Sequence, residues 1–68
     1  MSNFLGGVIT RIDHRAGFGT IMSGEYVYGF QADDTNGFED LAVGDPVIFR
    51  RDGDRALDVY LDYDPPAA

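Results

Sequence analysis

The chain has 68 residues, of which 44% are apolar, and its formal net charge is -7. This length allows one small core and leaves no room for a second domain. The chain has no cysteine and one histidine, His14, so we expect neither disulfides nor a metal or cofactor site. All five basic residues are arginines, against twelve acids, which disfavours tight long-range attraction to phosphate backbones.

The sequence also lacks the usual signals of membrane insertion and of catalysis. The longest uncharged run, residues 1–10, is far shorter than the roughly 20 residues of a membrane-spanning helix. No basic segment precedes an apolar stretch at the N-terminus, so we expect a cytoplasmic protein without membrane contact. No serine has a plausible histidine partner, and no glycine-rich phosphate loop with a lysine is present. We therefore predict a binding module and not an enzyme.

The first half of the chain predicts three antiparallel strands. Short apolar alternations interrupted by glycine are typical of strands and not of helices. We predict strands over residues 5–13, 18–23 and 26–30, joined by turns at 14–17 and 24–25. Gly6 and Gly7 indicate a bulge or a close backbone approach near the start of the first strand.

The second half predicts a long connection and then a hairpin. Residues 31–45 are rich in turn formers, with one helical turn around 39–42. Strands follow over residues 46–51 and 56–63, around the turn 52–54. The alternation predicts these core residues: Ile9, Ile21, Val27, Val47, Phe49 and Val59.

Five short strands grouped three plus two around a long loop favour a closed barrel, because closure removes exposed edges. The run GGVITRIDHRAGFGTI, residues 6–21, resembles the opening of a cold-shock domain, with its Gly-Phe-Gly ribonucleoprotein motif at 17–19. The run GFEDLAVGDPVIF, residues 37–49, resembles the second half of that family. The resemblance extends over about residues 5–62. It implies an all-β, five-stranded antiparallel OB-type barrel as a single domain over residues 1–64, with a frayed tail at 65–68.

The resemblance implies binding of single-stranded RNA or DNA by bases stacked on aromatic side chains of the second and third strands. Each stacked base contributes about 1 to 3 kcal/mol with little sequence preference. Phe18 matches the first aromatic of the motif, and Phe38 matches the loop phenylalanine of the family. We expect Gly17 and Gly19 to clear the space through which a base approaches Phe18.

The sequence departs from the family on this face. Arg11 and Ile12 stand where the family has an aromatic pair, Thr20 stands at the second aromatic of the motif, and Ala16 replaces a lysine. The platform is therefore reduced, and Arg11 and Arg15 supply its local positive charge. An alternative for Arg11 is an ion pair with Asp13.

The third strand allows two registers, and a shift of one residue would reverse every side chain. Without a bulge, Val27 and Gly29 face outward and the tyrosines face the core. With a bulge at Gly29, Val27 is buried, while Tyr26 and Tyr28 face outward beside Phe18. We favour the second register, because two buried tyrosine hydroxyls would need two partners in a small interior. The predicted aromatic patch is then Phe18, Tyr26, Tyr28 and Phe38, with Phe30 at its edge.

Two functions follow from this interpretation. The first is binding of single-stranded RNA or DNA at the aromatic patch, with the acids placed elsewhere; Asp52, Asp54, Asp58, Asp62 and Asp64 cluster late in the chain. The second is a barrel that has lost nucleic-acid binding and contacts a basic protein partner, since one fold serves many functions. We expect a monomer or a weak dimer in either case.

Overall fold

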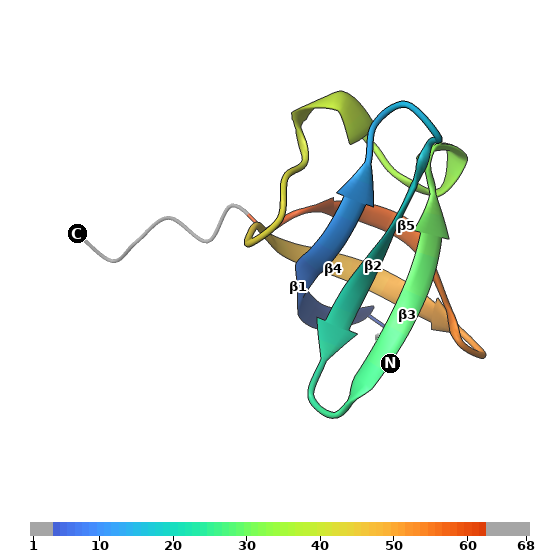
Figure 1. Cartoon of the computed structure of the whole chain (residues 1–68). Helices are drawn as coiled ribbons and strands as arrows, with labels where there is room; N and C mark the ends of the chain where they lie inside the picture. Colours follow the sequence, from blue (N-terminus) through green and yellow to red (C-terminus); the bar gives the residue numbers. More distant parts are fainter. Residues whose placement is uncertain (1–3, 63–68) are drawn as a thin grey trace.

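The computed structural model describes residues 4–62, which form an all-β closed barrel of five strands (Figure 1). The strands are β1 (Phe4–Asp13), β2 (Phe18–Ser23), β3 (Tyr26–Gln31), β4 (Pro46–Asp52) and β5 (Arg55–Leu61). Short 3-10 helices η1 (Ala32–Asp34) and η2 (Phe38–Asp40) lie in the long connection, the second close to the predicted helical turn. The bounds predicted for the first four strands are confirmed to within one residue. The predicted end of the fifth strand at Tyr63 and the predicted tail at 65–68 lie outside the described residues.

The strand order around the barrel is β1-β2-β3-β5-β4. Neighbouring strands are antiparallel except β3 and β5, which run parallel where Gly29 lies opposite Arg55. The prediction of a purely antiparallel barrel is therefore wrong. The reason is geometric, because an odd number of strands cannot alternate in direction all the way around a closed ring.

The core lies inside the barrel, and no polar or charged residue type is buried within residues 4–62. Its buried members are Ile9, Ile21, Tyr28, Phe30, Leu41, Val47, Phe49, Ala56 and Val59. Five of the six predicted core residues are among them. The sixth, Val27, is 51% exposed, so its predicted burial is wrong.

Two irregularities shape β1. Pairing with β2 shifts between Ile9 and Arg11, so Thr10 is an extra residue, and both Thr10 and Arg11 are exposed. Gly7 makes the close approach that the sequence indicated, because a Cβ there would lie 2.6 Å from Ile21 Cγ2 and 2.7 Å from the Met22 carbonyl oxygen. The β1 bulge is therefore at Thr10, while the glycine lets β1 and β2 pack closely.

The long connection lies over the end of the barrel at which β1 ends and β2 begins (Figure 1). Leu41 from this connection is buried in the core. His14 Nε2, in the β1–β2 turn, lies 2.8 Å from the Leu41 carbonyl oxygen, and the Ala32 amide donates to the Gly17 carbonyl oxygen. The turn before Phe18 is therefore held in place by the connection.

Candidate nucleic-acid interface

The register of β3 decides which aromatic side chains face outward. The β2 and β3 strands pair without interruption, with Thr20 opposite Gly29, Ile21 opposite Tyr28 and Met22 opposite Val27. Gly29 is therefore not a bulge. Tyr28 and Phe30 face the core and are only 5% and 2% exposed. The favoured register is wrong, and so is the exposure predicted for Tyr28 and Phe30.

The surroundings of the tyrosine hydroxyls explain why the observed register, without a bulge at Gly29, is possible. The Tyr28 hydroxyl makes no hydrogen bond to a described residue, and no buried side-chain oxygen in residues 4–62 lacks a partner. This hydroxyl therefore meets solvent, while the ring is buried against Phe49, with 5.1 Å between the ring centroids. Tyr26 begins β3 and is 66% exposed. Neither hydroxyl needs a buried partner, which removes the reason for the bulge.

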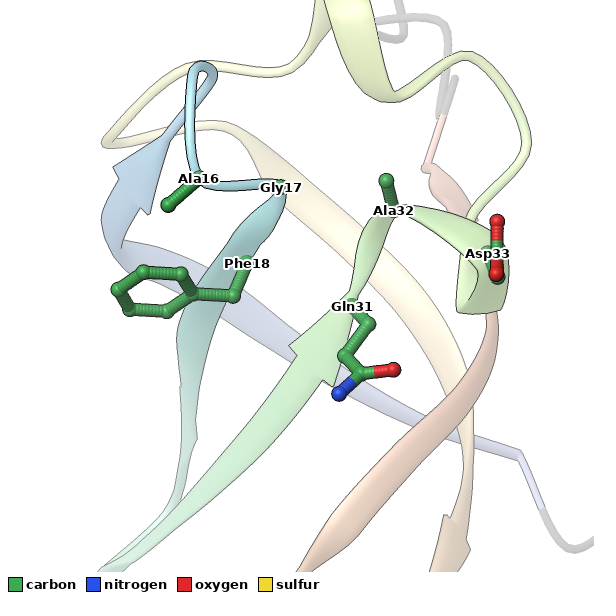
Figure 2. Close-up of a pocket in the computed structure, with 6 residues that line it drawn as sticks. All are labelled: Ala16, Gly17, Phe18, Gln31, Ala32 and Asp33. Carbon is green, nitrogen blue, oxygen red and sulfur yellow. The ribbon is translucent and has the colours of Figure 1, made fainter.

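Phe18 begins β2 and is 44% exposed, which confirms its predicted exposure. It lies between Asp13 of β1 and Gln31 of β3 in the strand register. Figure 2 shows the Phe18 ring and the Gln31 side chain, which extend from the neighbouring strands β2 and β3. No other aromatic ring of the described residues contacts the Phe18 ring. The ring is therefore available to a ligand.

Two shallow hollows border Phe18 and Gln31. One, of about 470 Å³, is shown in Figure 2 and is lined by Ala16, Gly17, Phe18, Gln31, Ala32 and Asp33. The other, of about 380 Å³, is lined by Phe18, Gly19, Thr20, Gly29, Phe30, Gln31 and Arg55. A flat group can therefore approach Phe18 from the η1 side or from the β5 side.

The glycines beside Phe18 serve the fold and also line the hollows, Gly17 the first and Gly19 the second. Gly17 has φ +80°, which the turn requires. Gly19 is buried, and a Cβ there would lie 2.5 Å from the Arg11 carbonyl oxygen and 2.6 Å from Cζ of Phe30. Gly29, opposite Thr20, adds open space to the second hollow, because a Cβ there would meet nothing within 4 Å.

The predicted four-ring patch is not assembled. Phe18 and Tyr26 lie at opposite ends of the β2–β3 hairpin, where Phe18 pairs with Gln31 and Tyr26 with Ser23. At about 3.4 Å per residue the two are roughly 17 Å apart along the strands. Phe38 is partly buried against the core, and its ring contacts Phe30 and His14 at centroid distances of 6.2 and 5.4 Å. Of the predicted stacking residues, Phe18 alone is both well exposed and next to the hollows.

Two arginines near Phe18 carry unpaired charge. Arg11 lies opposite Thr20 on the exposed face, and Arg15 is exposed in the turn. Neither forms an ion pair with a described residue. The alternative pair between Arg11 and Asp13 does not form; Asp13 Oδ1 accepts the backbone amides of Arg15 and Ala16 instead. Thr20 is half-buried, and its hydroxyl lies 2.9 Å from that of Thr10.

Acids also border this face. Asp33 lines one hollow, and Asp34 Oδ2 accepts a hydrogen bond from Arg55 Nη2 at 3.0 Å beside the other. The Asp54 carbonyl oxygen accepts the Gly29 amide at 3.0 Å, which brings the β4–β5 turn to the edge of β3. The predicted separation of acids from the binding face is therefore incomplete; Asp64 lies outside the described residues.

Sequence reasoning missed Gln31 and Arg55 as residues of this face, and it placed Gly29 outward only in the register that was not favoured. Alternation would have placed Gln31 and Gly29 outward once the register of β3 was known. No pattern in the neighbouring sequence indicated Arg55, because the parallel contact between β3 and β5 places it beside this face.

Comparisons with known proteins add no identification. No family model, no curated protein and no solved structure matches the chain. Within residues 4–62, no group of three or more His, Cys, Asp or Glu side chains is placed to hold a metal ion. No helix in that range is long and apolar enough to cross a membrane.

Proposed function

We propose that the protein binds single-stranded nucleic acid through the outer face of β1–β3, with one base stacked on Phe18. The observation that carries this proposal is the exposed Phe18 ring, bordered by two hollows and by two arginines without ion pairs. A closed five-stranded barrel is consistent with the OB-type barrel that the resemblance to cold-shock domains implies. The resemblance favours nucleic acid as the ligand.

In this proposal each group on the face has a separate task. The Phe18 ring stacks on one base, over the open position at Gly29. The Gln31 amide donates to and accepts from the edge of that base. Arg11 and Arg15 contact neighbouring phosphates and make the binding dependent on salt.

The affinity should be low, because the face offers one well-exposed ring. One stacked base contributes about 1 to 3 kcal/mol, and 1 mM corresponds to about 4 kcal/mol. With two phosphate contacts added, we expect a Kd on the order of 0.1 to 1 mM for a short strand at low salt. The acids beside the hollows act against tighter binding.

The first test is an amide NMR titration of the labelled protein with a short pyrimidine-rich single strand at low and moderate salt. We expect shifts at Phe18, Thr20, Gly29 and Gln31 that persist when salt is raised, because stacking is less sensitive to screening than phosphate contacts. A flat titration at low salt would overturn the proposal.

Substitutions then locate the site. Phe18→Ala should weaken binding by about 1 to 3 kcal/mol and leave the fold intact. Gly29→Val should also weaken binding, because its side chain occupies the open position beside Thr20. The matched control is Tyr26→Ala, which removes an exposed ring at the far end of the same hairpin and should leave the affinity unchanged. Equal losses in Phe18→Ala and Tyr26→Ala would contradict the assignment.

A further inference from the structure

A second exposed surface lies on the same barrel, away from Phe18. Val27 of β3, Met22 of β2, Val8 of β1 and Pro46 of β4 form one continuous row, in which each residue is the register partner of the next. All four are exposed. Exposed apolar residues scattered singly need no explanation. These four instead form an uninterrupted apolar row across four strands, here called the apolar stripe.

Apolar side chains continue beside the stripe. Gly6 lies opposite Ile48, and Ile48 lies opposite Tyr60. The rings of Phe4 and Tyr60 meet edge to face, with 6.1 Å between their centroids. A Cβ at Gly6 would meet nothing within 4 Å, so this position is open and has apolar neighbours. An inserted side chain could occupy it without displacing the barrel.

The size of the stripe suits one face of a helix. Neighbouring strands lie about 4.8 Å apart, so four strands span about 14 Å. Apolar residues at positions i, i+4 and i+7 of an amphipathic helix span about 10 Å along its axis. Two turns of such a helix therefore match three neighbouring strands of the row, at Val27, Met22 and Val8.

The charges around the stripe indicate the sign of the charge that a partner should carry. Glu25 precedes β3 next to the Val27 end, and Asp45 precedes Pro46 at the other end. The Asp62 amide donates to the Pro46 carbonyl oxygen, which places a further acid there. Arg50 on β4 is already paired with Asp58, with 2.8 Å between Nε and Oδ2. A second copy of this chain would bring another net charge of -7, so repulsion acts against self-association and favours a basic partner.

We propose that the apolar stripe docks an amphipathic helix of another protein, with lysine or arginine beside its apolar face. Leucine-type side chains of the helix pack on Met22 and Val8, and one enters the open position at Gly6. The basic side chains lie toward Glu25 and Asp45. Met22 lies four residues from Phe18 along β2, with Thr20 between them on the same outer face, so the stripe occupies the other end of that face. The proposal uses none of the groups assigned to nucleic-acid binding and does not depend on it.

The probe is a synthetic leucine–lysine peptide designed as an amphipathic helix, titrated into the protein and followed by methyl and amide NMR. We expect shifts at the methyl groups of Val8, Met22 and Val27. The control peptide has the same composition in a scrambled order without an apolar face, and should bind at least about tenfold more weakly, a difference of about 1.4 kcal/mol.

Substitutions separate the two surfaces. Val8→Thr with Met22→Thr keeps strand-forming residues and should weaken peptide binding at least about tenfold, while oligonucleotide binding at Phe18 stays unchanged. Should the double variant lose its fold, Met22→Lys alone tests the same contact, because it adds a charge that repels the basic peptide. Phe18→Ala should leave peptide binding unchanged.

Three results would overturn the proposal. The first is equal binding of the designed and scrambled peptides with shifts centred on the acidic turn at 52–54, which would mean charge attraction alone. The second is the absence of any binding. The third is concentration-dependent dimerisation in analytical ultracentrifugation that the Met22→Lys variant abolishes, which would make a second copy the occupant.

Discussion

Strands β2 and β3 carry glycine and aromatic residues in opposite arrangements. On β2, Phe18 is exposed and Gly19 is buried; on β3, Gly29 faces outward between the buried rings of Tyr28 and Phe30. The two arrangements are complementary, because Gly19 pairs with Phe30 and leaves room for its ring. Gly19 leaves the inner face of β2 without a side chain, and Gly29 leaves the outer face of β3 without one.

A glycine next to an aromatic residue therefore does not by itself indicate an exposed ring. The direction of the aromatic side chain depends on its position in the alternation of the strand. On β2 that position produces an exposed ring, and on β3 the same residue types produce core. The outward glycine on β3 then opens the face beside Phe18.

Single alanine substitutions of Phe30 on β3 and of Phe18 on β2 should differ most in stability. Phe30→Ala should lose about 3 to 5 kcal/mol of stability, enough to unfold a domain of this size. Phe18→Ala should cost less than about 1 kcal/mol, because its ring is partly in solvent. Chemical denaturation followed by circular dichroism compares the two. Equal losses would mean that Phe18 belongs to the core.

The two glycines give a second, smaller contrast. Gly19→Ala should destabilise the protein by about 1 to 3 kcal/mol, because the new Cβ would meet the Arg11 carbonyl oxygen and the Phe30 ring. Gly29→Ala meets open space and has no positive φ, so it should stabilise the strand by about 0.5 to 1 kcal/mol. Thermal unfolding of both variants measures the difference. A loss at Gly29 as large as that at Gly19 would contradict the observed alternation.

Local sequence patterns predicted the strands well. Alternation and turn residues placed the first four strands to within one residue, and the Gly-Phe-Gly motif predicted the exposure of Phe18. These features depend on a few neighbouring residues, for which steric preferences are strong.

Local sequence patterns could not predict the contacts between segments that are distant in the chain. The parallel contact of Gly29 with Arg55 joins residues far apart in the chain. The bulge at Thr10 carries neither glycine nor proline to mark it. The apolar stripe takes one residue from each of four strands, and Val27 was predicted as core. Once Phe18 is known to face outward, however, alternation along β2 also places Met22 outward.

The smallest effect tests why the register of β3 was predicted wrongly. The prediction assumed that a tyrosine facing the core buries its hydroxyl, whereas the Tyr28 hydroxyl meets solvent while its ring is buried. Tyr28→Phe should therefore change stability by less than about 0.5 kcal/mol, whereas a hydroxyl with a buried hydrogen bond would cost about 1 to 2 kcal/mol when removed. Denaturant midpoints of the two proteins at equal m-value decide between these values. A loss in the higher range would show that the Tyr28 hydroxyl has a partner inside the barrel, and the burial of this tyrosine would then need that partner after all.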